Sequence, residues 1–129
     1  MFGTLDISTS GLIAQRTRLE AVSANLANKD SIYDARGNYA PYRRRSVVLA
    51  SDSNGGVKVA KIELDQSAFR KVRDPGNPNA DKDGYVEYPN VDPAIEMINA
   101  VEASRSYEAN ITAAEATKSM FQSSLRLLA

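Results

Sequence analysis

Residues 92–128 read DPAIEMINAVEASRSYEANITAAEATKSMFQSSLRLL, and this stretch has the pattern of one long helix. Asp92 is a capping residue, and Pro93 follows at the first helical position, where proline is favoured. Glu96 falls in the first turn, where the helix dipole favours an acid. Steps of four and three residues then give a heptad-like stripe, which predicts packing against another helix. The stripe comprises Met97, Ala100, Ser104, Tyr107, Ile111, Ala114, Lys118, Phe121, Leu125 and Leu128.

The N-terminal part of the chain predicts a second helix, from about Asp6 to Asn28. Asp6 or Ser8 is available to cap it. Gly11 is a weak point that costs about 1 kcal/mol relative to alanine. Four leucines recur at a spacing of seven, namely Leu5, Leu12, Leu19 and Leu26. This spacing is typical of a seam between helices, so we expect the two terminal helices to pair, either parallel or antiparallel.

The middle of the chain predicts short strands. SVVLA (46–50) and VKVAKIEL (57–64) are separated by a Ser-Asn-Gly-Gly turn, and GYVEY (84–88) is a third short strand. The alternation of apolar residues slips within 57–64, which indicates either a bulge or burial on both faces. Because so few strands are not stable alone in water, we expect them to pack on the helices or on another molecule.

The fold class that follows is mainly α with a small β insertion. Residues 1–28 and 91–129 are predicted to form a discontinuous helical inner domain, with the two long helices paired as in a coiled coil. Residues 29–90 are predicted to be a loop and β-rich insertion.

The composition argues against catalysis. The 129 residues contain neither cysteine nor histidine, which removes the commonest nucleophile–base pairs and the usual transition-metal ligands. Sixteen basic and sixteen acidic residues balance, so no overall field favours nucleic acid. No segment approaches the roughly 20 apolar residues of a membrane span. We therefore predict that the chain is not an enzyme, binds no cofactor or small-molecule substrate, and does not span a membrane.

Two polar stretches resemble ligand sites. NADKDGYVEYPN (79–90) places Asn79, Asp81 and Asp83 at calcium-loop spacing, but Asn90 stands where the bidentate glutamate belongs. A polar turn that leads into a strand is the favoured interpretation, with a weak calcium site as the alternative. YRRRS (42–46) could bind phosphate, but a solvated or partner-facing strand end is favoured because extended arginines alternate between faces.

Tyrosines and alanines indicate packing surfaces. Tyrosine is common at interfaces, and ordinary core filling is an equally good interpretation of those in the central region. Alanines let helices approach closely on more than one side. The residues concerned are Tyr33, Tyr39, Tyr42, Tyr85, Tyr88, Ala21, Ala24, Ala27, Ala100, Ala103, Ala113, Ala114 and Ala116.

Two asparagines, Asn25 and Asn28, lie three residues apart near the end of the first helix. A helix terminator explains Asn28 well and Asn25 poorly. Because an amide donates and accepts at once, we predict that the pair sets the register between helices and between subunits, with Asn110 as a third member of the same layer.

The chain also resembles a known family. ANLAN (24–28) is similar to the Ala-Asn-x-Ala-Asn motif of bacterial flagellar axial proteins, the rod and hook group. MINAVEASRSYEANI (97–111) looks like their second signature, and two central stretches, 40–49 and 74–92, resemble the flagellar basal-body rod proteins. Lys29-Asp30-Ser31 replaces the Thr-Pro-Gly-Tyr type of turn that many members have, and this departure fits the proximal rod branch.

The resemblance implies a structural subunit of the flagellar proximal rod in the basal body. Such proteins are exported by the flagellar type III apparatus without a cleaved signal peptide, polymerise helically, line the export channel and transmit torque across the periplasm. The implied partners are the chain itself, other rod subunits, and the export-gate and MS-ring adaptor proteins. The alternative from the residues alone is a soluble coiled-coil adaptor that works as a dimer.

The predicted assembly surface combines the two stripes and the asparagines. Its members are Leu5, Leu12, Leu19, Asn25, Leu26, Asn28, Met97, Tyr107, Asn110, Ile111, Phe121 and Leu125.

Overall fold

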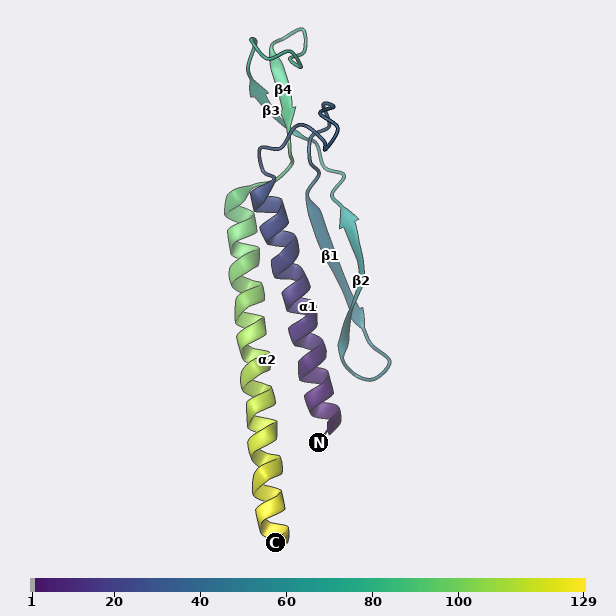
Figure 1. Cartoon of the computed structure of the whole chain (residues 1–129), viewed down its shortest axis with the longest axis vertical. Coiled ribbons are helices and arrows are strands. Elements are labelled where there is room, and N and C mark those ends of the chain that lie inside the picture. The colour runs from purple at the N-terminus through teal and green to yellow at the C-terminus, as the bar shows by residue number, and fades with distance from the viewer. Residues whose placement is uncertain (1) are drawn as a thin grey trace.

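The computed structural model describes residues 2–129 and shows an elongated molecule built on two long helices (Figure 1). The helices run antiparallel, and a long β hairpin lies along the first of them. A second, shorter hairpin lies beyond the end where the helices meet the central region. The elements in chain order are α1 (Phe2–Ala27), β1 (Arg45–Ser51), β2 (Val57–Leu64), β3 (Arg70–Arg73), β4 (Tyr85–Tyr88) and α2 (Pro93–Leu128). The predicted class, mainly α with a small β insertion, is confirmed.

The two helix starts differ in how well the sequence predicts them. Asp92 caps α2, with its Oδ1 accepting a hydrogen bond from the Ala94 N–H at 2.9 Å, and Pro93 occupies the first turn as expected. The predicted start of α1 at Asp6 or Ser8 is wrong, because α1 already begins at Phe2 and Ser8 is buried within it. The extra turn continues a helix whose later residues Ser8, Gly11 and Ala14 are buried, and burial of this kind supports a helix more strongly than a local cap.

The long hairpin contains the predicted irregularity. β1 and β2 pair antiparallel, with Val48 opposite Lys61 and Leu49 opposite Val59, so Ala60 has no partner. This confirms the bulge, which rotates the second half of β2 relative to the first. β3 was not predicted, since its residues Arg-Lys-Val-Arg show little apolar alternation; it pairs with β4 in a separate two-stranded sheet.

The long hairpin rests on α1 at both of its ends. At its tip, the Val57 N–H donates to Ser10 Oγ at 3.1 Å, and Gly56 lies so close to Ser10 that a Cβ there would overlap the hydroxyl. At its base, Arg45 bonds Asn25. Two strands are marginal alone in water, so this support is what allows the hairpin to persist.

The seam between α1 and α2 is lined by small and polar residues. The buried positions are Ser8, Gly11, Ala14, Val22 and Asn25 on α1, and Glu96, Ala103 and Thr117 on α2. Small side chains let the two backbones approach closely, and this leaves little room for large apolar groups.

The predicted stripe of α2 is therefore displaced by about one residue from the true seam. Glu96, Ala103 and Thr117 are buried where Met97, Ser104 and Lys118 were expected, and those three are exposed. Leu125 and Leu128 are exposed as well, whereas Ala100, Tyr107, Ile111, Ala114 and Phe121 are half-buried. The four leucines of α1 are half-buried, so they flank the seam. Within residues 2–129, no helix combines the length and the apolar character needed to cross a lipid bilayer.

Candidate functional site

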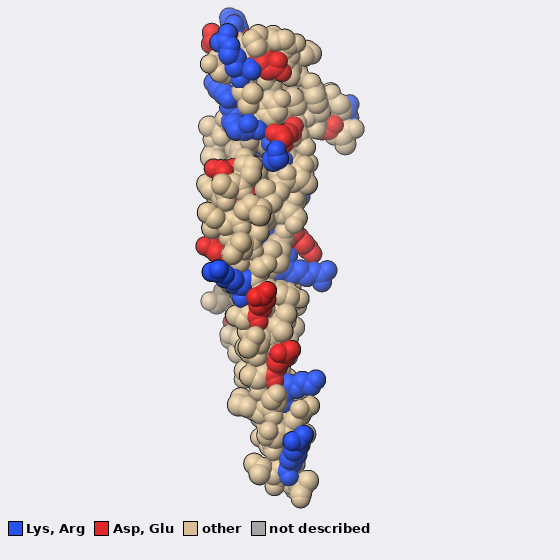
Figure 2. All heavy atoms as spheres, turned by 90° about the vertical axis from the view of Figure 1, so that its left-hand side faces the viewer, with Lys and Arg blue, Asp and Glu red and all other residues tan. Residues whose placement is uncertain are grey.

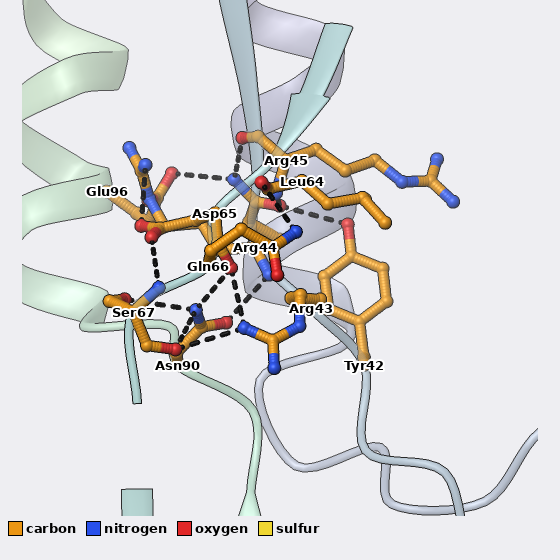
Figure 3. A network of polar contacts seen from close by, with 11 residues as sticks. Tyr42, Arg43, Arg44, Arg45, Leu64, Asp65, Gln66, Ser67, Asn90 and Glu96 are labelled. Atoms are coloured by element: carbon orange, nitrogen blue, oxygen red, sulfur yellow. Dashed lines mark hydrogen bonds and ion pairs between the residues drawn. The ribbon is translucent and has the colours of Figure 1, made fainter. Parts of the chain in front are cut away.

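A cluster of buried and half-buried polar residues joins α1, α2 and the base of the long hairpin (Figure 3). We call it the polar hub, and it consists of Asn25, Tyr42, Arg44, Asp65, Asn90 and Glu96. These residues come from four different segments of the chain. Their contacts therefore hold these segments in place relative to one another.

Asn25 is the centre of the hub and is only 1% exposed. Its Nδ2 donates to the Arg45 carbonyl at 2.9 Å and to Glu96 Oε2 at 3.2 Å. Its Oδ1 accepts from the Arg45 N–H and from the Tyr42 hydroxyl, both at 2.9 Å. The amide thus pairs with the Arg45 backbone as a neighbouring strand would, and its two donors and two lone pairs are all used.

Glu96 brings α2 into the hub. It is fully buried, yet it lies in the first turn of α2, and it accepts hydrogen bonds from Asn25 and from Arg44 Nε. The other end of the Arg44 guanidinium reaches Asp65, with 3.5 Å between Nη1 and Oδ2. A buried carboxylate needs partners of this kind, because an unpaired charge out of water is costly.

Asn90 and Arg43 hold the segment that follows β2 in place through hydrogen bonds to its backbone. Asn90 accepts from the Arg44 N–H at 2.8 Å and donates to the Asp65 carbonyl at 3.0 Å. Arg43 donates to the carbonyls of Asp65 and Ser67 at 2.8 and 3.0 Å, and it stacks 4.2 Å over the ring of Phe69. Backbone groups outside regular structure are thereby satisfied.

Two groups of the hub have shifted pKa values. Burial raises the pKa of Tyr42, and the Glu96 carboxylate adds to this while Arg45 opposes it. Hydrogen bonds from Ser67, first its backbone N–H and then its hydroxyl, lower the pKa of Asp65, and Arg44 contributes in the same direction. The Tyr42 shift thus follows from its burial in the hub, and the Asp65 shift follows from its hydrogen bonds.

The hub corrects the favoured interpretation of YRRRS. Of the three arginines only Arg45 is exposed; Arg44 turns inward to Glu96, and Arg43 covers Phe69. Sequence reasoning placed Glu96 in the first turn of the helix but did not predict that it is buried and bonded to Asn25 and Arg44. A recurrence of small or polar residues every seven positions could have located it, at Glu96, Ala103, Asn110 and Thr117.

The three asparagines do not form one layer, contrary to the prediction. Asn28 ends α1, since its Nδ2 donates to the Ala24 carbonyl at 2.8 Å and its Oδ1 accepts from the Ser31 hydroxyl at 3.1 Å. Asn110 lies beside Gly11, far along α1 from Asn25. Because Asn25 bonds Glu96, it does link the two helices of one chain, but its amide has no bond left for a neighbouring subunit.

Gly11 lies directly against the Asn110 side chain of α2. A Cβ added there would lie 2.7 to 2.8 Å from three atoms of the Asn110 amide. Glycine at this position is therefore a contact requirement rather than only a weak point of the helix.

We expect Gly11→Ala to destabilise the chain by about 1 to 2 kcal/mol, because overpacking outweighs the gain of about 1 kcal/mol in helix propensity. In an Asn110→Ala background the same change has room, so it is expected to become neutral or stabilising. Urea denaturation of the four chains measures this coupling. A similar loss in both backgrounds would show that Gly11 matters for another reason.

Large apolar side chains lie on the outside of the helices. Seen from the α2 side, Figure 2 shows a broad uncharged surface over the upper half of the helix pair, below the Lys and Arg side chains that gather at the short-hairpin end. At 3.6 residues per turn, Ile98 and Val101 lie on the face of α2 opposite to Glu96 and Ala103. Large side chains on this helix that are at least 48% exposed are Ile95, Met97, Ile98, Val101, Met120, Leu125, Leu127 and Leu128, and on α1 Ile7 and Ile13 are similar.

Comparison with known proteins gives matches over nearly the whole chain. A family model described as "Flagella basal body rod protein" matches residues 5–30, and one described as "Flagellar basal body rod FlgEFG protein C-terminal" matches residues 82–127. Flagellar basal-body rod protein FlgC of Bacillus subtilis (strain 168) is 43% identical over 98% of this chain and 97% of its own length. The protein of the same name from Salmonella typhimurium (strain LT2) is 44% identical over the same shares. The one from Borreliella burgdorferi is 37% identical over 99% and 97%. The chain belongs to the flagellar basal-body rod protein family.

Membership of the rod family makes the chain a structural protein of the flagellar basal body, as the resemblance predicted. The two matched regions correspond to the helical ends of the structure. Residues 5–30 cover most of α1 and the Asn28 turn, and residues 82–127 cover β4 and nearly all of α2. The region between them carries β1, β2 and β3.

The short-hairpin end of this rod-family chain is held by turns and tyrosines. Asp81 Oδ1 accepts from the N–H groups of Asp83 and Tyr85, both at 2.9 Å, and Gly84 adopts a positive φ of 83°. This confirms the polar turn leading into β4. Across residues 2–129, no three acidic side chains converge in a way that could hold a metal ion. The Tyr39 hydroxyl bonds both backbone groups of Glu87, at 2.9 and 3.0 Å.

Proposed function

We propose that this rod-family chain is a non-catalytic subunit of the proximal rod that polymerises helically around the export channel. In this role it lines the channel and transmits torque across the periplasm. Its partners would be further copies of itself, other rod proteins, and the export-gate and MS-ring adaptor proteins at the base of the rod.

The observation that carries the proposal is that the helix pair has its large apolar residues on the outside and not in the seam. Small and polar residues fill the seam inside the chain, while Ile98, Leu127 and other large apolar residues face outward, Leu127 being 88% exposed. Exposed apolar surface on this scale marks a protein–protein interface. Neighbouring subunits would cover it in a shaft, where heterologous contacts between two different faces of each subunit repeat without closing on a pair.

The predicted assembly residues divide into three groups on this basis. Met97 and Leu125 are exposed and can contact a neighbour directly. Asn25 and Asn28 act within the chain, so their contribution to assembly would be to fix the shape of the subunit. The remaining members are half-buried beside the seam and would contact both the chain itself and its neighbour: Leu5, Leu12, Leu19, Leu26, Tyr107, Asn110, Ile111 and Phe121.

The domain division and the route of export belong to the same proposal. The helical ends, residues 1–28 and 91–129, would form the inner domain around the channel, and residues 29–90 would form the outer part. Export through the type III apparatus without a cleaved signal is compatible with a chain that contains no cysteine, since threading and refolding then need no thiol chemistry.

Complementation in the bacterium tests the proposed function. Cells that lack the chain are expected not to swim and to build no hook or filament, and a tagged copy is expected to restore swimming and to purify with detergent-extracted basal bodies. An unrelated tagged periplasmic protein serves as the control for adventitious recovery. Swimming without the chain, or a tagged copy that restores swimming but never purifies with basal bodies, would contradict the proposal.

A further inference from the structure

The two helices each carry a second stripe, on the face opposite to the seam that joins them. On α1 this outer stripe includes Ile13, which is 60% exposed, together with Arg16 and Glu20. On α2 it includes Ile98, Arg105 and Glu108, all exposed. Since each helix has its seam on one side and this stripe on the other, one helix pair can be flanked by another pair on either side.

The outer face of α2 is hollowed where large side chains line it. The hollow has a volume of about 370 Å³ and is lined by Met97, Ile98, Val101, Glu102 and Arg105. Farther along the same face the side chains are small, at Ala109, Thr112 and Ala113. The outer face of α1 has the same order along the chain: the large Ile13 is at its middle, and the small Ala24 and Ala27 are near its end. In an antiparallel pair, the large residues of one helix therefore meet the small residues of the other.

Resting on the proposed function, we propose that the outer stripe of α2 binds the outer stripe of α1 from a second copy of this chain. Subunits of a shaft share one polarity, so the α1 of the neighbour runs antiparallel to this α2, as the chain's own α1 does. Ile13 of the neighbour then packs on the small residues around Thr112. Ala24 and Ala27 of the neighbour face the large side chains of the hollow.

The charges specify how far the second copy is displaced along the shaft. Within the chain, Asn25 lies beside Glu96 and Gly11 beside Asn110. If the neighbour's α1 met α2 at this same level, Arg16 would face Arg105 and Glu20 would face Glu102. Like charges in direct opposition are unfavourable.

A displacement of the neighbour by about four residues, or roughly 6 Å of helix rise, brings opposite charges together in place of like charges. Arg16 of the neighbour then faces Glu108, and Glu20 faces Arg105, so both pairs join opposite charges. The same displacement places Ala27 beside Ile98 and Ile13 beside Thr112, which matches small side chains to large ones. Charge and size therefore select a staggered neighbour, as in a helical array, over a level one, as in a flat ring.

Cysteine cross-linking in assembled basal bodies tests this register, and the chain has no cysteine of its own to interfere. A full-length chain with Ala27→Cys and Ile98→Cys is expected to form a disulfide-linked dimer on mild oxidation. Ile13→Cys with Ile98→Cys is the matched control, since these positions would lie some 14 residues, or about 20 Å, out of register. A dimer from the control pair, links only to other proteins, or no dimer in basal bodies that contain the chain would overturn the inference.

A charge exchange provides the second measurement. Glu20→Arg and Arg105→Glu are each expected to lower the yield of the Ala27–Ile98 cross-link at least tenfold, and the double exchange is expected to restore it to within about threefold. No recovery in the double variant would overturn the register. Recovery of the chain in basal bodies is scored separately, so the proposed function can stand when this inference fails.

Discussion

Replacing Glu96 with alanine is expected to lower the free energy of unfolding by about 2 to 4 kcal/mol. Removing one member of a buried ion pair costs about 3 to 5 kcal/mol, because the other member is left without compensation. The Arg44 side chain is 22% exposed and keeps Asp65 as a neighbour, which reduces the expected loss. Asn25 also loses one acceptor, and this adds to the cost.

The location of the damage is part of this first prediction. Because Glu96 connects α2 to the base of the hairpin through Arg44, amide hydrogens of β1 and β2 are expected to exchange faster in the Glu96→Ala chain. Urea denaturation followed by circular dichroism gives the change in stability, and hydrogen exchange gives its location.

Glu96→Gln is the matched control, since it keeps the shape and the acceptor oxygen but removes the charge. Its loss is expected to be about half that of alanine. Equal losses for the two variants would mean that the charge is essential and the hydrogen-bond geometry is not. An alanine variant within about 0.5 kcal/mol of the original chain would refute the structural role of the hub.

A carboxylate on the outer face of α2 is expected to have a large effect on assembly and little effect on folding, whereas Glu96→Ala affects folding. Ile98 is 59% exposed in the single chain, so Ile98→Asp is expected to change the free energy of unfolding by less than about 0.5 kcal/mol. In the rod this side chain would be covered by a neighbour. A buried, unpaired carboxylate costs several kcal/mol, which corresponds to about a thousandfold or greater loss of affinity.

We therefore expect cells that carry Ile98→Asp to make a stable chain but to lose swimming and rod assembly. Ser104→Asp introduces the same charge six residues away, at an exposed polar position to the side of the outer stripe, and is expected to leave swimming nearly unchanged. Swimming plates, together with electron microscopy of basal bodies, measure the difference. Normal swimming with Ile98→Asp would show that this face stays in solvent.

The asparagines of the ANLAN motif illustrate how local and long-range information differ. Asn28 could be interpreted from its neighbours alone, because terminating a helix needs only the preceding turn and the following loop. Asn25 could not, since its partners Tyr42, Arg45 and Glu96 are 17 to 71 residues away in the chain. The unusual presence of an amide on a helix was visible in the sequence, but the bonds that explain it were not.

The sequence by itself determined that two long terminal helices exist, the capped start of α2, the long hairpin with an irregularity in its second strand, and the family. These depend on local periodicity, on turn residues and on motif order, which are written along the chain. Only the tertiary structure decided which face of each helix is internal. Neighbouring stripes of α2 differ by one residue, and both contain residues compatible with a seam, so spacing cannot separate them. The choice depends on the close approach at Gly11 and on the pairing of Glu96 with Arg44, contacts that exist only once the distant segments are brought together.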